Sequence, residues 1–146
     1  MKNLSDLLTA AQNVTLPAAM QKSGQSAPSF GIVNNRNGKR THYSKGLVQR
    51  LGLTDTVDLM PVPEDSCILI ARQLPMANAM KAKLKDDDAR KISYATQPVH
   101  VLTEMFSLDY TNRSSMTFTK IQFDELPDGT PVAIVQVEAA QVTEEA

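Results

Sequence analysis

Residues 30–53, FGIVNNRNGKRTHYSKGLVQRLGL, decide the fold class. The apolar start is typical of a short strand, and the Asn- and Gly-rich segment 34–39 is typical of a hairpin turn, because Asn and Gly tolerate positive φ. A return strand at 40–43 completes the hairpin. Ser44 is a favourable N-cap, so a helix of about two turns is expected between it and Gly52. This order of strand, turn, strand and short helix predicts an α+β fold.

Most of the remaining chain has strand character. Residues 56–59 alternate polar and apolar side chains, and 67–71 form a continuous apolar run, so both are predicted to be strands. Residues 76–89 are mostly charged and are interpreted as a partly helical connector. The elements predicted after it are a strand at 91–94, a helix that contains 99–106, a strand at 115–123 and a strand at 132–137. The fold is therefore expected to be mostly β.

The two halves of the chain repeat this order of elements. Residues 39–44 align with 90–95 at an offset of 51, and the helix position Val48 falls on Val99 at the same offset. Because units this small rarely bury a core alone, we expect them to pack as a pseudo-symmetric pair. The alternative is a chance resemblance between short β-rich segments, since the halves share few identical residues.

The sequence predicts five segments. They are a flexible leader at 1–29 with a short amphipathic helix, a first unit at 30–75, a charged connector at 76–89, a second unit at 90–138, and an acidic tail at 139–146. Leu4, Leu7 and Leu8 form one face of the leader helix and are candidates for binding a protein partner.

Composition excludes several classes of protein. Hydrophobic residues make up 42 % of the 146 residues, which is enough to bury a core, and no apolar run approaches the roughly 20 residues of a membrane span. A single cysteine excludes an intrachain disulfide and a cysteine-based zinc site, and it favours a cytoplasmic location. His42 and His100 have no metal-ligand spacing, and no serine stands in a Gly-x-Ser-x-Gly motif, so no enzyme activity, cofactor or metal is expected.

Basic side chains are concentrated in one part of the first unit. The net charge of the chain is −1, but residues 31–52 contain five Lys and Arg and no acidic residue. Such a segment can face a polyanion, and its Asn side chains can contact bases or backbone. The side chains expected to contact DNA are Asn35, Arg36, Asn37, Lys39, Arg40, Lys45, Arg50, Arg90, Lys91 and Arg113.

The first unit contains a set of short motifs in a fixed order: Gly38-Lys39, Ser44, Leu47, Leu51-Gly52-Leu53 and Ile68-Leu69-Ile70. With these motifs, residues 30–75 resemble the AbrB-like family of transition-state regulators, and the second unit joins through the duplication. The resemblance implies a swapped-hairpin fold, here two tandem units that form an intrachain pseudo-dimeric barrel, and DNA binding through basic loops. The chain departs from the family at Val48-Gln49, where many members carry paired arginines, and at Asn34-Asn35, where the first loop is usually basic.

Two functions follow from these observations. The first is a DNA-binding transcription regulator of phage or mobile-element type, with duplex DNA as its partner. The second is a protein-binding module without catalysis, such as an antitoxin, an adaptor or a phage-encoded inhibitor of a host protein. Both functions are compatible with a homo-oligomer.

Overall fold

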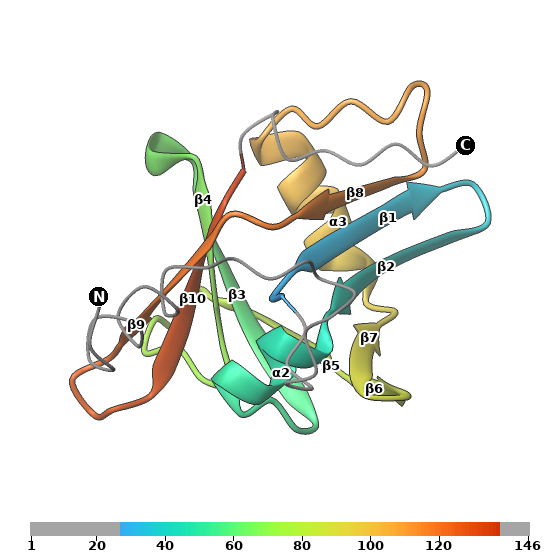
Figure 1. Ribbon diagram of the computed structural model, residues 1–146. Helices are drawn as coiled ribbons and strands as arrows, with labels where there is room; N and C mark the ends of the chain where they lie inside the picture. The colour runs from blue at the N-terminus through green and yellow to red at the C-terminus, as the bar shows by residue number, and fades with distance from the viewer. Residues whose placement is uncertain (1–26, 138–146) are drawn as a thin grey trace, which may run out of the picture.

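The computed structural model describes residues 27–137 (Figure 1). In this part of the chain strands dominate, and they form two separate sheets, sheet A and sheet B, accompanied by two α-helices. The prediction of an α+β fold that is mostly β is therefore confirmed. The predicted leader helix and the tail at 139–146 lie outside the described residues.

Each sheet contains strands from both halves of the chain. Sheet A has the order β6 (Lys85–Asp87), β7 (Arg90–Ser93), β2 (Gly38–Tyr43), β1 (Phe30–Asn35) and β8 (Ser115–Phe118). Sheet B has the order β5 (Met80–Lys83), β3 (Thr56–Val62), β4 (Cys67–Ala71), β10 (Pro131–Gln136) and β9 (Ile121–Glu125). All neighbouring strands are antiparallel.

The predicted closed barrel is wrong for these strands. β6 and β8 are the edges of sheet A, β5 and β9 are the edges of sheet B, and no strand ladder joins one sheet to the other within residues 27–137. A barrel requires every strand to have two hydrogen-bonded neighbours, so the architecture is two facing sheets instead.

The hydrophobic core lies between the two sheets. The helical elements are α2 (Lys45–Leu51), α3 (Thr96–Met105) and the 3₁₀ turn η2 (Pro63–Asp65) between β3 and β4. α3 contacts β1 and β2 of sheet A as well as β3 and β5 of sheet B, and Figure 1 shows it behind β1. α2 contacts β10 and β7, so the two helices close different sides of the core. Neither of the two helices is long and apolar enough to cross a membrane.

Three aromatic side chains set the register of sheet A. Phe30 lies opposite Tyr43 on one neighbouring strand and opposite Phe118 on the other. The ring centroids are 5.4 Å apart in the first pair and 6.5 Å apart in the second, and all three side chains are buried. The Tyr43 hydroxyl shares a hydrogen bond of 3.0 Å with Thr41 Oγ1, so its polar end is satisfied inside the core.

The predicted caps of the first helix are confirmed. Ser44 Oγ accepts a hydrogen bond from the backbone N–H of Leu47 at 3.2 Å, and Gly52 ends the helix in the left-handed conformation with φ 65°. Ser44 Oγ also accepts a bond of 2.8 Å from the backbone N–H of Ser29. One hydroxyl therefore ties the start of β1 to the start of α2.

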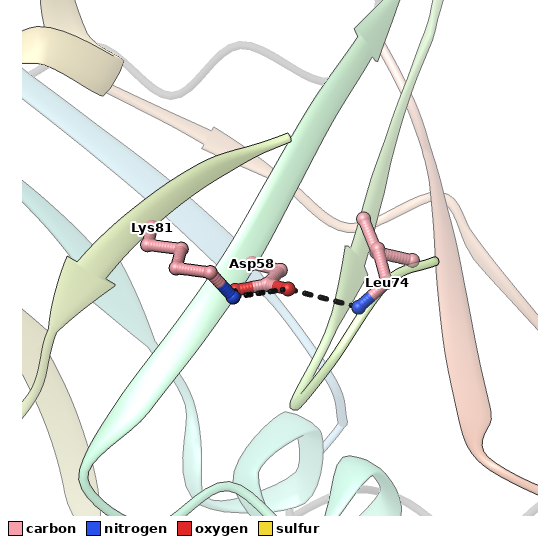
Figure 2. Close-up of polar contacts among 3 residues, drawn as sticks. All are labelled: Asp58, Leu74 and Lys81. Carbon is pink, nitrogen blue, oxygen red and sulfur yellow. Dashed lines mark hydrogen bonds and ion pairs between the residues drawn. The ribbon is translucent and has the colours of Figure 1, made fainter. Parts of the chain in front are cut away.

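A buried carboxylate fixes the loop that covers sheet B. Asp58 on β3 is 1 % exposed and lies opposite Ala71, on the face of sheet B that turns away from the main core. Its carboxylate accepts a hydrogen bond of 2.9 Å from the backbone N–H of Leu74 and bonds of 3.1 Å from Lys81 Nζ (Figure 2). Leu74 belongs to a small apolar cluster with Ala71 and Val132, so Asp58 holds this loop against the sheet.

The predicted helical character of the connector 76–89 is wrong. The helical spacing of Met76, Met80 and Leu84 suggested it, but the segment forms β5 and β6. On β5, Met80 and Ala82 are buried while Lys81 and Lys83 are exposed, which is the two-residue period of a strand. Pairing with β3 therefore outweighs the local helical pattern.

The predicted strand at 115–123 is two strands. Residues 115–118 form β8 in sheet A, and residues 121–125 form β9 in sheet B. Thr119 and Lys120, both exposed, connect them. The alternation shifts by one residue at this break, because Met116 and Phe118 face the core before it and Ile121 and Phe123 pack against the core after it.

The segments aligned as repeats are neighbours in both sheets. β2 lies beside β7, and β4 lies beside β10. In the antiparallel pairing of β2 with β7, His42 is opposite Ile92 and Tyr43 is opposite Lys91. Tyr43 is 0 % exposed and Tyr94 is 57 % exposed, so these two aligned tyrosines have different surroundings.

Replacing Ser44 tests the double role of its hydroxyl. Ser44→Ala removes the acceptor for two backbone N–H groups, and we expect the free energy of unfolding to fall by about 1–2 kcal/mol. Urea denaturation measures this change, and Ser44→Asp, which keeps a capping oxygen, is the control. Equal stability of the Ala and Asp variants would contradict the assignment.

Replacing Asp58 separates its two partners. Asp58→Ala leaves the buried N–H of Leu74 without an acceptor and is expected to cost about 1–3 kcal/mol of unfolding free energy. Lys81→Met removes a side chain that is 71 % exposed and is expected to cost less than about 1 kcal/mol. A larger effect for Lys81→Met in the same urea denaturation would show that the ion pair, and not the loop contact, dominates.

Candidate nucleic-acid interface

The face of sheet A that turns away from the core carries a groove. Strand alternation places Gly31, His42 and Thr117 in one row across β2, β1 and β8, because the neighbouring row is occupied by the buried aromatic rings. The groove has a volume of about 370 Å³ and lies within the range of small-ligand sites. The residues that line it are Ser29, Gly31, Ile32, Val33, Asn35, Arg40, His42, Ser44, Arg90, Ser114, Ser115, Met116 and Thr117.

The charged and titratable side chains that line the groove are basic. Arg40 and His42 come from β2 and Arg90 from β7, and no carboxylate is among the lining residues. Arg40 Nε donates a hydrogen bond of 3.1 Å to His42 Nε2, so the imidazole is neutral in this arrangement. Hydroxyl groups of Ser and Thr from β8 and the preceding loop line the opposite side. The groove thus offers donors and positive charge to an anion.

The surroundings of His42 disfavour its charged form. Burial has the largest effect and lowers the pKa of His42 from its usual 6.5, and the positive charges of Arg40 and Arg90 lower it further. Asp87 acts in the opposite direction. Asp87 also accepts a hydrogen bond of 2.8 Å from Arg90, and both side chains of this pair are partly exposed.

Gly31 lines the bottom of the groove and adds no side chain to it. A Cβ atom at this position would lie 3.5 Å from His42 Cβ and 3.7 Å from the Met116 carbonyl oxygen, which are ordinary van der Waals distances. The backbone of β1 therefore does not require glycine here. A glycine within a strand weakens the strand and often marks the close approach of a ligand.

The tip of the β1–β2 hairpin is a second exposed basic element. Asn35 Oδ1 accepts a hydrogen bond of 2.8 Å from the backbone N–H of Asn37, which stabilises the turn. Lys39 Nζ donates to Asn34 Oδ1 at 2.9 Å, while Asn34 Nδ2 donates to Thr103 Oγ1 on α3 at 3.3 Å. Arg36 is exposed at the tip. The hairpin is thereby held against α3 with its tip directed to solvent.

The structure brings together only some of the side chains expected to contact DNA. Asn35, Arg40 and Arg90 line the groove, and Arg36, Asn37 and Lys39 belong to the adjoining hairpin. The remaining four are not among the residues that line the groove, and they are Lys45, Arg50, Lys91 and Arg113.

Two of these four have clear alternative contacts. Arg50 lies over the ring of Phe123, 4.0 Å from its centroid, next to Asp124 and Glu125 at the edge of sheet B. Lys91 forms an ion pair of 2.6 Å with Asp86 on β6. Both side chains therefore lie outside the groove that Arg40 lines, and their contact with DNA stays a prediction. Lys45 begins α2, and Arg113 follows Tyr110 in the loop between α3 and β8.

Sequence reasoning missed Gly31, His42 and Thr117 as site residues. His42 has no ligand-type neighbour in the sequence, but the alternation of β2 puts it on the same face as Arg40. That signal is available from the sequence once the strand is assigned. The contribution of β8 is not, because its pairing with β1 joins residues more than 80 positions apart.

No other chemical centre competes with the groove in the described part of the chain. Residues 27–137 contain no group of three His, Cys, Asp or Glu side chains that could hold a metal ion. Cys67 is buried on β4, and burial together with Asp65 raises the pKa of its thiol. Comparison with known proteins adds no assignment: no family model, no curated protein and no solved structure matches the chain.

The lowered pKa of His42 predicts a pH-dependent stability. Because the unfolded chain binds this proton more readily than the folded protein, the free energy of unfolding should decrease as the pH falls below about 6.5. Urea denaturation at pH 7.5 and 5.5 measures the decrease. In His42→Gln it should be smaller, and an identical decrease in both proteins would contradict the predicted shift.

Proposed function

We propose that this chain is a DNA-binding regulatory protein that contacts the phosphate backbone through the groove of sheet A and the β1–β2 hairpin. The observation that carries the proposal is the groove itself, in which Arg40, His42 and Arg90 meet without a carboxylate among the lining residues. Guanidinium and hydroxyl groups are the donors that proteins most often present to phosphate oxygens.

The shape of the hairpin supports the same proposal. β1 and β2 are paired along their whole lengths, from Phe30 opposite Tyr43 to Asn35 opposite Gly38. Figure 1 shows the hairpin turn extending away from the body of the protein. A two-stranded ribbon fits the major groove of duplex DNA. Arg36 and Asn37 at its tip would then approach the bases, while the groove of sheet A holds the backbone.

The strand order supports an origin from two tandem swapped-hairpin units, 30–75 and 90–138. In sheet A the hairpin β1–β2 lies beside the hairpin β6–β7, and in sheet B the hairpin β3–β4 lies beside the hairpin β9–β10. In sheet B the inner strands β4 and β10 are the last strands of the two units and run antiparallel, as a two-fold axis requires. In sheet A the inner strands β2 and β7 also run antiparallel, but β6 lies in the connector 76–89. We propose that such a chain is a cytoplasmic regulator of phage or mobile-element origin.

A pair of matched arginine variants tests DNA binding. Arg40→Gln and Arg50→Gln each remove one positive charge, but only Arg40 lines the groove, whereas Arg50 stacks on Phe123. With about five phosphate contacts, the log–log slope of affinity against salt should be about −4 to −5. We expect Arg40→Gln to weaken binding by about tenfold and to reduce the steepness of this slope by about one. Arg50→Gln should change the affinity by less than about twofold, since it loses only long-range charge.

Fluorescence anisotropy with a labelled pool of random duplexes measures both variants. Equal losses for Arg40→Gln and Arg50→Gln would mean that binding depends on overall charge and not on the groove. Failure of the unaltered protein to bind any duplex at low salt would refute the proposal and favour the protein-binding module.

A further inference from the structure

We infer that the groove of sheet A is a seat for a single phosphate group, held by Arg40, His42 and Arg90, and that His42 gains a proton when the seat is filled. The inference deepens the proposed function, on which it rests, because a backbone phosphate of DNA would occupy the seat. A free phosphorylated molecule has the same chemistry, and the experiment below distinguishes the two sources.

The floor of the seat is the backbone of β1 at Gly31. Neighbouring rows of the sheet carry side chains on this face, but Gly31 carries none, so the backbone of β1, which is buried at this position, forms the bottom of the groove between His42 and Thr117. Steric conflict does not exclude a larger residue at position 31, since a Cβ atom here would make only ordinary contacts. A glycine that the strand does not need for steric reasons, at the bottom of a groove lined by hydrogen-bond donors, is typical of a place where a ligand approaches the backbone closely.

The walls supply donors and positive charge from several elements. β2 contributes Arg40 and His42, β7 contributes Arg90, and β8 contributes the Thr117 hydroxyl. The acidic group that acts on His42 is Asp87 on β6, and it is already bonded to Arg90. An anion in the groove would thus meet two guanidinium groups, which bind phosphate in a planar, two-pronged way.

The hydrogen bond between Arg40 and His42 couples the seat to protonation. In the structure Arg40 Nε donates to His42 Nε2, which requires a neutral imidazole with its proton on Nδ1. A protonated imidazole has no acceptor, so proton uptake from solvent releases the Arg40 guanidinium from this bond. Both side chains can then donate to the same anion.

A bound anion favours the protonated form, and this fixes the direction of the pH dependence. Without ligand, burial and the two arginines keep the pKa of His42 below its usual value. An anion in the seat opposes these effects and raises that pKa. Between the two pKa values binding takes up a proton, so the affinity for the anion increases as the pH falls. Each unit by which the pKa rises corresponds to up to about tenfold in affinity.

Sulfate is a suitable probe because it does not titrate between pH 5 and 8, whereas inorganic phosphate does. We would follow the imidazole signals of the full chain by NMR over this pH range, with sodium sulfate or with sodium chloride at equal ionic strength. The His42→Gln variant identifies the signal of His42. The expected result is a saturable rise of the His42 pKa with sulfate only, and an equal response to chloride would overturn the seat.

A larger side chain at position 31 tests the anion site with a substitution that is expected to leave the fold stable. Gly31→Val places a β-branched side chain in a strand, so the free energy of unfolding should stay equal or increase, while the sulfate-dependent shift of His42 should disappear. Gly31→Ala is the milder variant and should reduce the shift. If stable Gly31→Val protein still shows the full shift, the anion lies elsewhere and the seat is refuted.

Duplex DNA distinguishes the source of the phosphate. At constant ionic strength the unaltered protein should bind duplex several-fold more tightly at pH 6 than at pH 7.5, and His42→Gln should show no such difference. Sulfate binding without DNA binding would support the seat for a free phosphorylated molecule and would refute the DNA function. DNA binding that is independent of pH and unaffected by Gly31→Val would refute the seat and leave the DNA function standing.

Discussion

The packing of Phe30 between Tyr43 and Phe118 is the interaction on which the rest of the structure depends. These rings come from three adjacent strands of sheet A and are buried against sheet B. A shift of either neighbouring strand by one residue would move an aromatic ring to the outer face and bring His42 or Thr117 into the core. Because it is unfavourable to bury polar side chains in place of aromatic rings, the register of β2, β1 and β8 is strongly specified.

The same constraint creates the groove. In a strand, each residue directed to the core fixes its neighbour on the opposite face. Burial of Phe30 therefore places Gly31 outside, burial of Tyr43 places His42 outside, and the two lie opposite each other. The groove and the aromatic core lie on opposite faces of the same three strands. The packing of the core therefore also fixes the positions of the strands that form the groove.

Local patterns predicted the elements whose determinants are close in sequence. The hairpin, the Ser44 cap and the Gly52 terminus were predicted because each depends on a few adjacent residues. The acid-free segment 31–52 does not form one surface, because strand alternation and the turn of α2 direct its basic side chains to different places. Arg40 faces the groove, whereas Arg50 reaches sheet B. The pairing of β8 with β1 and of β5 with β3 depends on distant segments, and no local period carries that information.

The basic groups of the groove come from both halves of the chain. Arg40 and His42 lie on β2, and Arg90 lies on β7, which pairs with β2 in antiparallel orientation. Because the two strands are neighbours in sheet A, the two arginines line one groove although they are far apart in the sequence. In the strand pair, His42 lies opposite the apolar Ile92, so β7 adds no second imidazole. The segment 30–75 thus supplies an imidazole and an arginine, the segment 90–137 supplies an arginine alone, and neither segment by itself contains the three basic groups that an anion would meet.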